Sequence, residues 1–175
     1  HLSTLDKTNK SMEIFGQRWA DYIRRIKVNW ERLVNDTDTV IIPGDISWAM
    51  NFKEAQADFR FLNDELNGTK YILKGNHDYW WNTANKINNF FKEKEIEGIS
   101  ILHNNFHEYG DVAICGTRGW FLENDTPEDI KVLNREVGRL RMSIDSALET
   151  GKEPIVFLHY PPVTTDRKCE EILEV

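Results

Sequence analysis

Hydrophobic residues recur at three- and four-residue steps through several stretches of the chain, which is typical of helices with one buried face. The last of these stretches has the clearest start, because Thr126 can cap a helix and Pro127 suits its first position. Another helix is predicted to begin after Asn82 or Thr83. The three long stretches are 11–34, 54–66 and 126–148.

Short apolar runs lie between these stretches and predict buried strands. The alternation of helices with short strands indicates an α/β fold. We see neither an internal repeat nor a low-complexity linker, so residues 1–175 are expected to form a single domain. The predicted strands are 39–42, 71–73, 99–102, 112–115 and 155–158.

Three of the predicted strands run directly into polar residues that can bind metals. The first leads to Gly44-Asp45, the second to Gly75-Asn76-His77-Asp78, and the last to His159. In open α/β sheets, ligands bind beyond the carboxyl ends of the strands. We therefore expect these three groups to converge on one site although they are far apart in sequence.

These residue types suit a pair of cations. Asp45 offers two carboxylate oxygens that can bridge two metals, Asn76 offers a carbonyl oxygen and His159 an imidazole nitrogen. Mixed oxygen and nitrogen ligands suit Mn, Fe, Zn or Ni. Two such cations can activate water and clamp both oxygens of a phosphoryl displacement. His77 would then be free to protonate the leaving oxygen, and Asp78 could orient its ring.

Gly44-Asp45, Gly75-Asn76-His77-Asp78 and His159 are similar to the second, third and fourth motifs of calcineurin-like metallophosphoesterases. Their order and spacing fit the family, in particular its predicted phosphohydrolases of bacterial type. The opening His1-Leu2-Ser3 resembles the end of the family's first motif, Asp-x-His. The resemblance covers essentially the whole chain.

The resemblance implies a layered α-β-β-α sandwich and hydrolysis of a phosphomonoester or phosphodiester by a metal-bridging hydroxide. It implies two divalent or mixed-valence metal ions. His1 would bind the first metal, Asp45 both metals, and Asn76 and His159 the second. His77 would be the catalytic histidine, paired with Asp78.

The same resemblance implies that the sequence lacks parts of the family's metal site. The Asp of the first motif would precede His1, and the fifth motif, Gly-His-x-His, would follow Val175. We therefore expect the 175-residue chain to bind metal weakly or partially and the intact protein to bind two metals.

Several residues allow two interpretations. Arg118 could hold a substrate phosphate or form a surface salt bridge. The aromatic residues after the predicted strand ends could wall a site or cover the sheet edge. A metal-free scaffold that retains the fold is the alternative function, and the expected ligand types at each position within the chain argue against it. These aromatic residues are Trp48, Tyr79, Trp80, Trp81, Trp120 and Phe121.

Composition limits the partners and the compartment. The net charge is −7, and no Lys/Arg block suggests a nucleic-acid groove. Two cysteines without metal-type spacing fit a reducing compartment. No apolar run approaches the length of a membrane helix and no signal peptide is visible, so a cytoplasmic phosphate-ester hydrolase is expected. The sequence leaves the substrate, the metal and the oligomeric state open.

Overall fold

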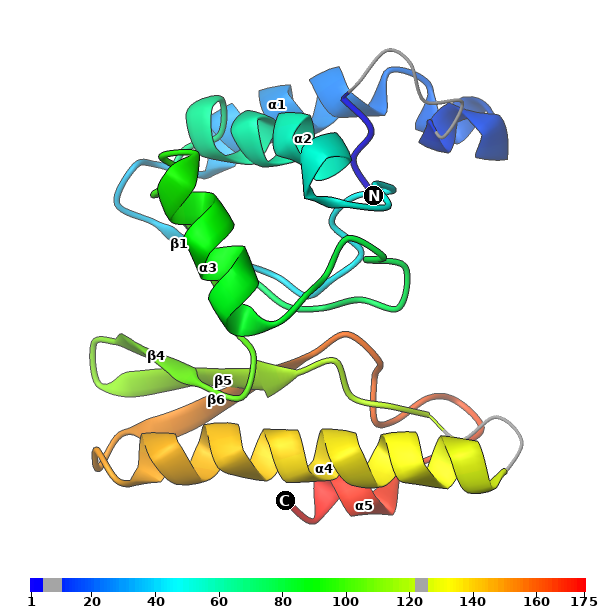
Figure 1. Ribbon diagram of the computed structural model, residues 1–175, viewed down its shortest axis with the longest axis vertical. Helices are drawn as coiled ribbons and strands as arrows, with labels where there is room; N and C mark the ends of the chain where they lie inside the picture. Colours follow the sequence, from blue (N-terminus) through cyan, green and yellow to red (C-terminus); the bar gives the residue numbers. More distant parts are fainter. Residues whose placement is uncertain (5–10, 122–125) are drawn as a thin grey trace. The chain divides into compact units, whose positions relative to one another are not determined.

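A computed structural model describes residues 1–4, 11–121 and 126–175. It divides into two compact units, His1–Ile101 and Leu102–Val175, and each unit contains one three-stranded sheet with helices packed on it (Figure 1). The predicted α/β class is confirmed, and so is the presence of two sheets. Within the described ranges, no helix is long and apolar enough to cross a membrane.

The sheet of the first unit is entirely parallel. Ile42 lies opposite Ile72, and Ile72 lies opposite Ile101, so the first two strands end at one edge of the sheet. The loops that follow these two strands carry Asp45 and His77. The strands, in spatial order, are β1 (Thr39–Ile42), β2 (Thr69–Ile72) and β3 (Ile99–Ile101).

The first helix is shorter than the hydrophobic pattern predicts. Gly16 (φ 111°) and Asp21 (φ 53°) have backbone angles that an α-helix does not allow. The predicted helix over 11–34 is therefore wrong in its first half, which forms two short 3₁₀ turns instead. The helices of this unit are the 3₁₀ turns Met12–Phe15 and Gln17–Trp19, then α1 (Tyr22–Leu33), α2 (Phe52–Asp64) and α3 (Ala84–Glu93).

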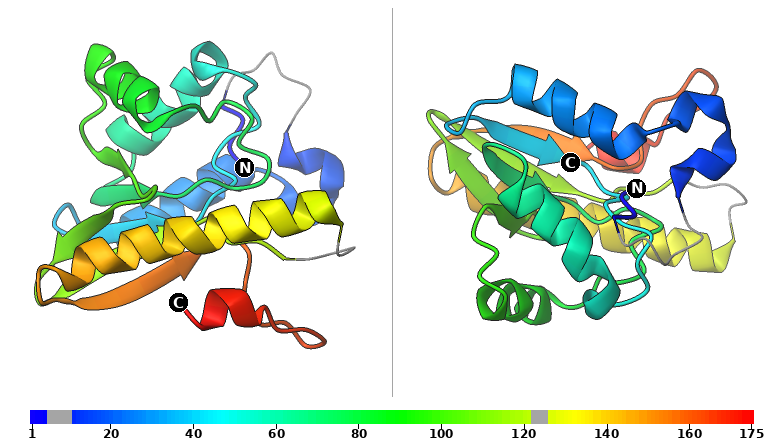
Figure 2. Two further views of the ribbon diagram at one scale, coloured as in Figure 1. Left: turned by 60° about the horizontal axis from the view of Figure 1, so that its bottom comes forward. Right: turned by 90° about the horizontal axis from the view of Figure 1, so that it is seen from above.

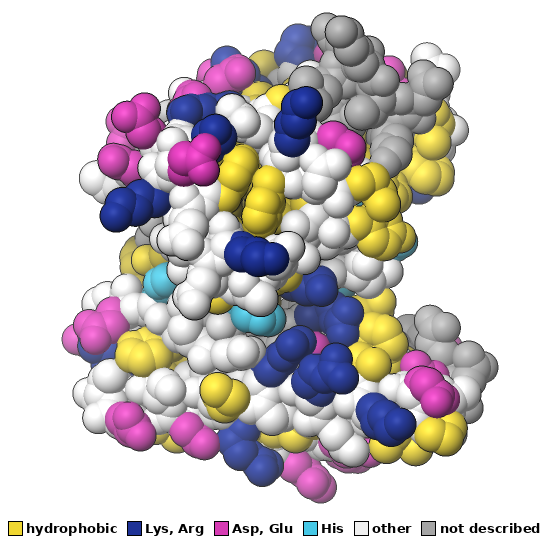
Figure 3. Space-filling view, in the orientation of Figure 1, with side chains coloured by type: hydrophobic (Ala, Val, Ile, Leu, Met, Phe, Trp, Pro, Cys, Tyr) yellow, Lys and Arg dark blue, Asp and Glu magenta, His cyan; other side chains and the backbone are white. Residues whose placement is uncertain are grey.

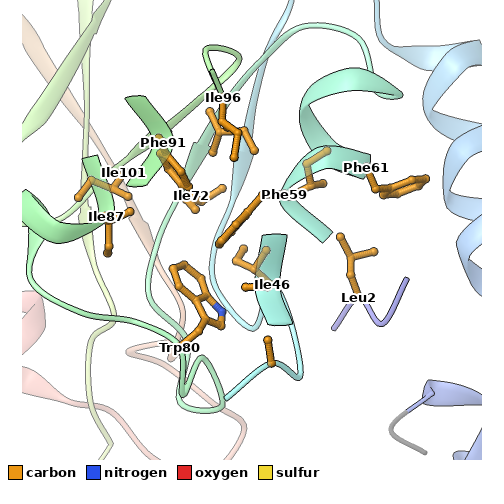
Figure 4. Packing of buried hydrophobic residues seen from close by; sticks show 14 of the residues in the cluster. Leu2, Ile46, Phe59, Phe61, Ile72, Trp80, Ile87, Phe91, Ile96 and Ile101 are labelled. Carbon is orange, nitrogen blue, oxygen red and sulfur yellow. The ribbon is translucent and has the colours of Figure 1, made fainter. Parts of the chain in front are cut away.

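An aromatic cluster joins α2 and α3 to this sheet (Figure 4). The ring of Phe59 meets Trp80 edge-on at 4.8 Å and Phe91 at 5.1 Å between centroids. Burying such a side chain contributes about 1.5–3 kcal/mol. Leu2 belongs to the same cluster, so the core also anchors the segment that carries His1.

The second unit has a mixed sheet. Strands β4 and β5 form an antiparallel hairpin, and β5 pairs in parallel with β6. Helix α4 packs on the sheet (Figure 2). Its residues Ile144 and Ala147 lie in a hydrophobic cluster with Cys115 of the sheet. Thr126 caps α4 as predicted. The elements are β4 (Phe106–Tyr109), β5 (Val112–Thr117), α4 (Pro127–Leu148), β6 (Glu153–Leu158) and α5 (Glu170–Leu173).

Two features of this unit differ from the sequence analysis. Strand β4 is not among the predicted strands, because its polar residues give no apolar run. Strand β6 is predicted to be buried, but Ile155 and Val156 are 44% and 40% exposed. In the space-filling view, charges of both signs are spread over the face shown, with one group of Lys and Arg side chains above α4 (Figure 3).

Candidate metal centre

The loop after β1 holds Asp45 in an unusual backbone conformation. Gly44 has φ 101° and Asp45 has φ 56°, in the left-handed region that costs a residue with a Cβ about 1–2 kcal/mol. The loop after β2 approaches it closely. A Cβ on Gly75 would lie 2.1 Å from Asp45 Oδ1 and 2.2 Å from the Asp45 nitrogen. Glycine at position 75 therefore allows the two loops to interlock.

The buried carboxylate of Asp78 holds the Asp45 loop in place. Three consecutive N–H groups donate to it, from Asp45 (2.8 Å), Ile46 (2.7 Å) and Ser47 (3.3 Å). The Gly75 N–H (2.7 Å) and the indole of Trp80 (3.0 Å) donate as well. Successive N–H groups that converge on an anion form a concave nest, and here the anion is part of the protein.

These contacts give Asp78 a structural role in the Asp45 loop, and its expected pairing with His77 stays a prediction. Burial raises the pKa of the Asp78 carboxyl, while the backbone N–H groups that donate to it act in the opposite direction. Asp45 contacts the His77 ring, because its Oδ2 lies 3.2 Å from His77 Nδ1. The His77 backbone N–H also donates to Asp45 Oδ1 at 3.0 Å. Asp78 therefore shapes the Asp45 loop, and Asp45 orients His77.

The segment that carries His1 lies beside the same loop. Leu2 forms a parallel β-bridge with Ser47. The Leu2 N–H donates to the Ile46 carbonyl (2.7 Å), and the Trp48 N–H donates to the Leu2 carbonyl (3.2 Å). His1 thus extends from a segment that runs alongside the loop after β1.

Three potential metal ligands meet where these segments converge. His1 Nε2 lies 3.3 Å from Asp45 Oδ2, and the same oxygen faces His77 Nδ1. One ligand atom from each residue lies within 4.8 Å of the other two. The side chains of His1 and Asp45 are 11% and 20% exposed, and that of His77 is 39% exposed. The group is therefore sheltered at His1 and open to solvent at His77.

The donor set fits a divalent cation. His1 Nε2 is buried and makes no hydrogen bond, although it faces a carboxylate. A buried polar atom without a partner costs about 1–3 kcal/mol. A cation between His1 and Asp45 would satisfy this nitrogen, and imidazole together with carboxylate suits transition metals.

Aromatic rings near this group divide between the two interpretations left open by the sequence. The ring of Trp48 stacks on His1 at 3.8 Å between centroids, and Tyr79 meets His77 edge-on at 6.0 Å. These two rings wall the candidate site. Trp80 is 2% exposed and belongs to the core, where its indole contacts Asp78.

The other two predicted metal ligands are Asn76 in the first unit and His159 in the second. Asn76 is exposed in the loop between Gly75 and His77. His159 follows β6 in the second unit, where its ring meets Tyr160 edge-on at 5.0 Å. Asn76 and His159 belong to different units, so a metal shared between them stays a prediction.

Arg118 is engaged by a buried acid in the second unit. Glu136 of α4 is fully buried, and its carboxylate accepts hydrogen bonds from Thr117 (2.5 Å), Arg118 (3.3 Å) and Arg139 (2.7 Å). The Arg118 guanidinium also lies 4.7 Å from the ring centroid of Trp120. Its side chain is only 17% exposed, so this ion pair is not the surface salt bridge considered for it.

The model of the calcineurin-like phosphoesterase family matches residues 16–174. The chain belongs to this family. The matched region includes Asp45, Asn76, His77 and His159, whereas His1 precedes it. The chain matches no curated protein and no solved structure.

Sequence reasoning missed the polar residues that support this candidate site. Asp58 is 4% exposed on α2, and its carboxylate accepts hydrogen bonds from Thr4 and Ser47. A signal was present, because Asp58 lies among inward-facing residues of the helix, next to Phe59 and one turn before Leu62. A carboxylate on an apolar helix face needs buried partners.

Proposed function

We propose that this protein hydrolyses phosphate esters with two divalent cations. His1 and Asp45 would hold the first cation, and Asp45, Asn76 and His159 the second. The observation that carries the proposal is the buried His1 Nε2, which makes no hydrogen bond and lies 3.3 Å from Asp45 Oδ2. A buried imidazole nitrogen facing a carboxylate favours a metal-binding role over the alternative of a metal-free scaffold.

When bound, the cations supply a nucleophile at neutral pH by lowering the pKa of water, and they neutralise charge on the phosphate. The oxygen and nitrogen ligands are compatible with Mn, Fe, Zn or Ni. Both phosphomonoesters and phosphodiesters fit this chemistry. The residues of the chain would hold the metal ligands in position and transfer a proton to the leaving oxygen.

His77 is the proposed proton donor to the leaving oxygen. Its backbone N–H and its Nδ1 are both held by Asp45, which leaves Nε2 for the substrate. The 39% exposure of the His77 side chain lets a substrate reach it. General acids placed in this way contribute about 10²–10⁴-fold to the rate.

Arg118 is the proposed phosphate contact. Thr117 pairs with Leu158 in the β5–β6 register, and the Tyr160 N–H donates to the Arg118 carbonyl at 2.9 Å, so Arg118 lies opposite His159. Glu136 restrains the guanidinium of Arg118. A restrained guanidinium beside a proposed metal ligand suits charge-assisted binding of a phosphate.

The test compares His77→Ala with the unaltered protein. We expect kcat toward p-nitrophenyl phosphate or its bis ester, with added Mn²⁺, to fall by about 10²–10⁴-fold. Bound Mn²⁺, measured by elemental analysis, should stay unchanged because His77 acts on the proton. His107→Ala on β4 is the matched control and should retain kcat. Near-normal turnover by His77→Ala would remove His77 from the mechanism, and unaltered protein without metal and without hydrolysis would reject the function.

A further inference from the structure

Asp58 is a buried acid that the proposed chemistry does not use. It lies on α2 and is 4% exposed, among core residues that include Ala55, Phe59 and Leu62. An ionised carboxylate is costly to bury unless hydrogen bonds compensate for the lost water. The partners of Asp58 therefore indicate what this residue does.

The two oxygens of Asp58 bind two different segments. Oδ1 accepts the backbone N–H of Thr4 at 2.7 Å and its hydroxyl at 2.6 Å. Oδ2 accepts the hydroxyl of Ser47, whose Oγ in turn accepts the Ala49 N–H at 3.1 Å. One side chain on α2 thus binds both the segment that starts at His1 and the loop that follows β1.

These are the two segments that carry His1 and Asp45. Thr4 is three residues after His1, and Ser47 is two residues after Asp45. Between them, the β-bridge of Leu2 with Ser47 aligns the segments. Backbone pairing sets their separation, and Asp58 fixes both of them to the same helix.

We infer that Asp58 is a positioning residue for the metal centre, which holds the His1 segment and the Asp45 loop in the register that brings His1 Nε2 to Asp45 Oδ2. The expected effect of Asp58 on metal affinity rests on the proposed function. Residues that orient metal ligands typically change affinity by about 10–100-fold when they are mutated. The geometric part of the inference does not depend on a metal.

The first measurement is Mn²⁺ affinity, with free Mn²⁺ followed by electron paramagnetic resonance. In Asp58→Asn the amide keeps one acceptor oxygen but places a donor where the second accepted. We expect its dissociation constant for Mn²⁺ to rise by about 10-fold or more. Thr4→Val and Ser47→Ala each remove one hydrogen bond to Asp58 and should give smaller increases. They take the place of Asp58→Asn if that variant does not fold.

The matched control is Ser143→Ala. Ser143 is also fully buried, and its hydroxyl also joins a helix to another segment, because it donates to the Asn105 carbonyl and accepts the Gly116 N–H. It belongs to the second unit, whereas the segments that Asp58 joins belong to the first unit. Ser143→Ala should lower stability as Ser47→Ala does but leave the Mn²⁺ dissociation constant unchanged.

The second measurement needs no metal. Trp48 stacks on His1, so we expect its ring current to shift the His1 imidazole proton resonances upfield. Comparison with His1→Asn assigns these resonances. We expect Asp58→Asn, or both single-contact variants, to reduce this shift and Ser143→Ala to preserve it.

The two measurements separate the positioning role from the proposed function. Weaker Mn²⁺ binding together with a reduced His1 shift supports the positioning role. An unchanged His1 shift in all three site variants overturns it, whatever the metal affinity. If the unaltered protein binds no Mn²⁺, the proposed function fails, and the His1 shift still decides whether Asp58 positions this segment.

Discussion

Each unit of this protein buries an acidic side chain near a strand end, and the two acids have different partners. Asp78 accepts hydrogen bonds from four backbone N–H groups and one indole. Glu136 accepts hydrogen bonds only from side chains among its described contacts, those of Thr117, Arg118 and Arg139. Asp78 thus fixes the path of the chain, whereas Glu136 fixes the position of two cationic groups.

The difference matters because backbone and side chains respond differently when the acid is lost. The N–H groups around Asp78 are held by the turn of the chain and cannot reach water without unfolding the loop. The side chains of Arg118 and Arg139 are 17% and 27% exposed, so they can move toward solvent. An acid that shapes the backbone should therefore be harder to replace than one that restrains arginines.

The largest expected effect comes from Asp78→Asn. The amide would place its NH₂ against N–H donors, so buried donors lose their acceptor. We expect the free energy of unfolding to fall by about 3 kcal/mol, measured by urea denaturation. Asp64→Asn, an exposed acid of α2 paired with Arg60, is the control and should change stability by less than about 1 kcal/mol. Equal losses for the two variants would contradict a structural role for Asp78.

A smaller effect is expected from Glu136→Gln. The amide oxygen can still accept one hydrogen bond, and the freed arginines can reach water. We expect a loss of about 1–2 kcal/mol in the free energy of unfolding. Glu93→Gln, on an acid whose side chain is 71% exposed, is the control and should be nearly neutral. A loss as large as that of Asp78→Asn would remove the proposed difference between the two acids.

The sequence predicts the elements that have strong local signals. Thr126 and Pro127 mark the start of α4, and apolar runs mark β1, β2 and β5, because caps and buried strands depend on neighbouring residues. The predicted helix over 11–34 is wrong in its first half because the hydrophobic spacing continues through Gly16 and Asp21, where the backbone leaves the helical conformation. Hydrophobic spacing indicates which residues face inward, but it does not indicate a change of backbone conformation.

The sequence predicts the candidate site residues better than the residues that hold them in place. Asp45 and His77 follow parallel strands that end at one edge, so their proximity follows from topology. Asp78 contacts residues that are 31 to 33 positions away in the chain. Asp58 contacts Thr4, which is 54 positions away, and no local pattern reveals contacts of this kind. The backbone contacts of Asp78 and the contacts of Asp58 are therefore not predicted from the sequence, and the pairing of Asp78 with His77 stays a prediction.

The central claim is that Asp45 is the carboxylate on which a metal centre is built. Equilibrium dialysis with Mn²⁺ on the purified protein and on Asp45→Asn tests it most directly. The account predicts that the unaltered protein binds Mn²⁺ and that Asp45→Asn binds it at least about 10-fold more weakly, because a neutral amide replaces the charged ligand. Equal Mn²⁺ binding by the two proteins, or none by either, would contradict it.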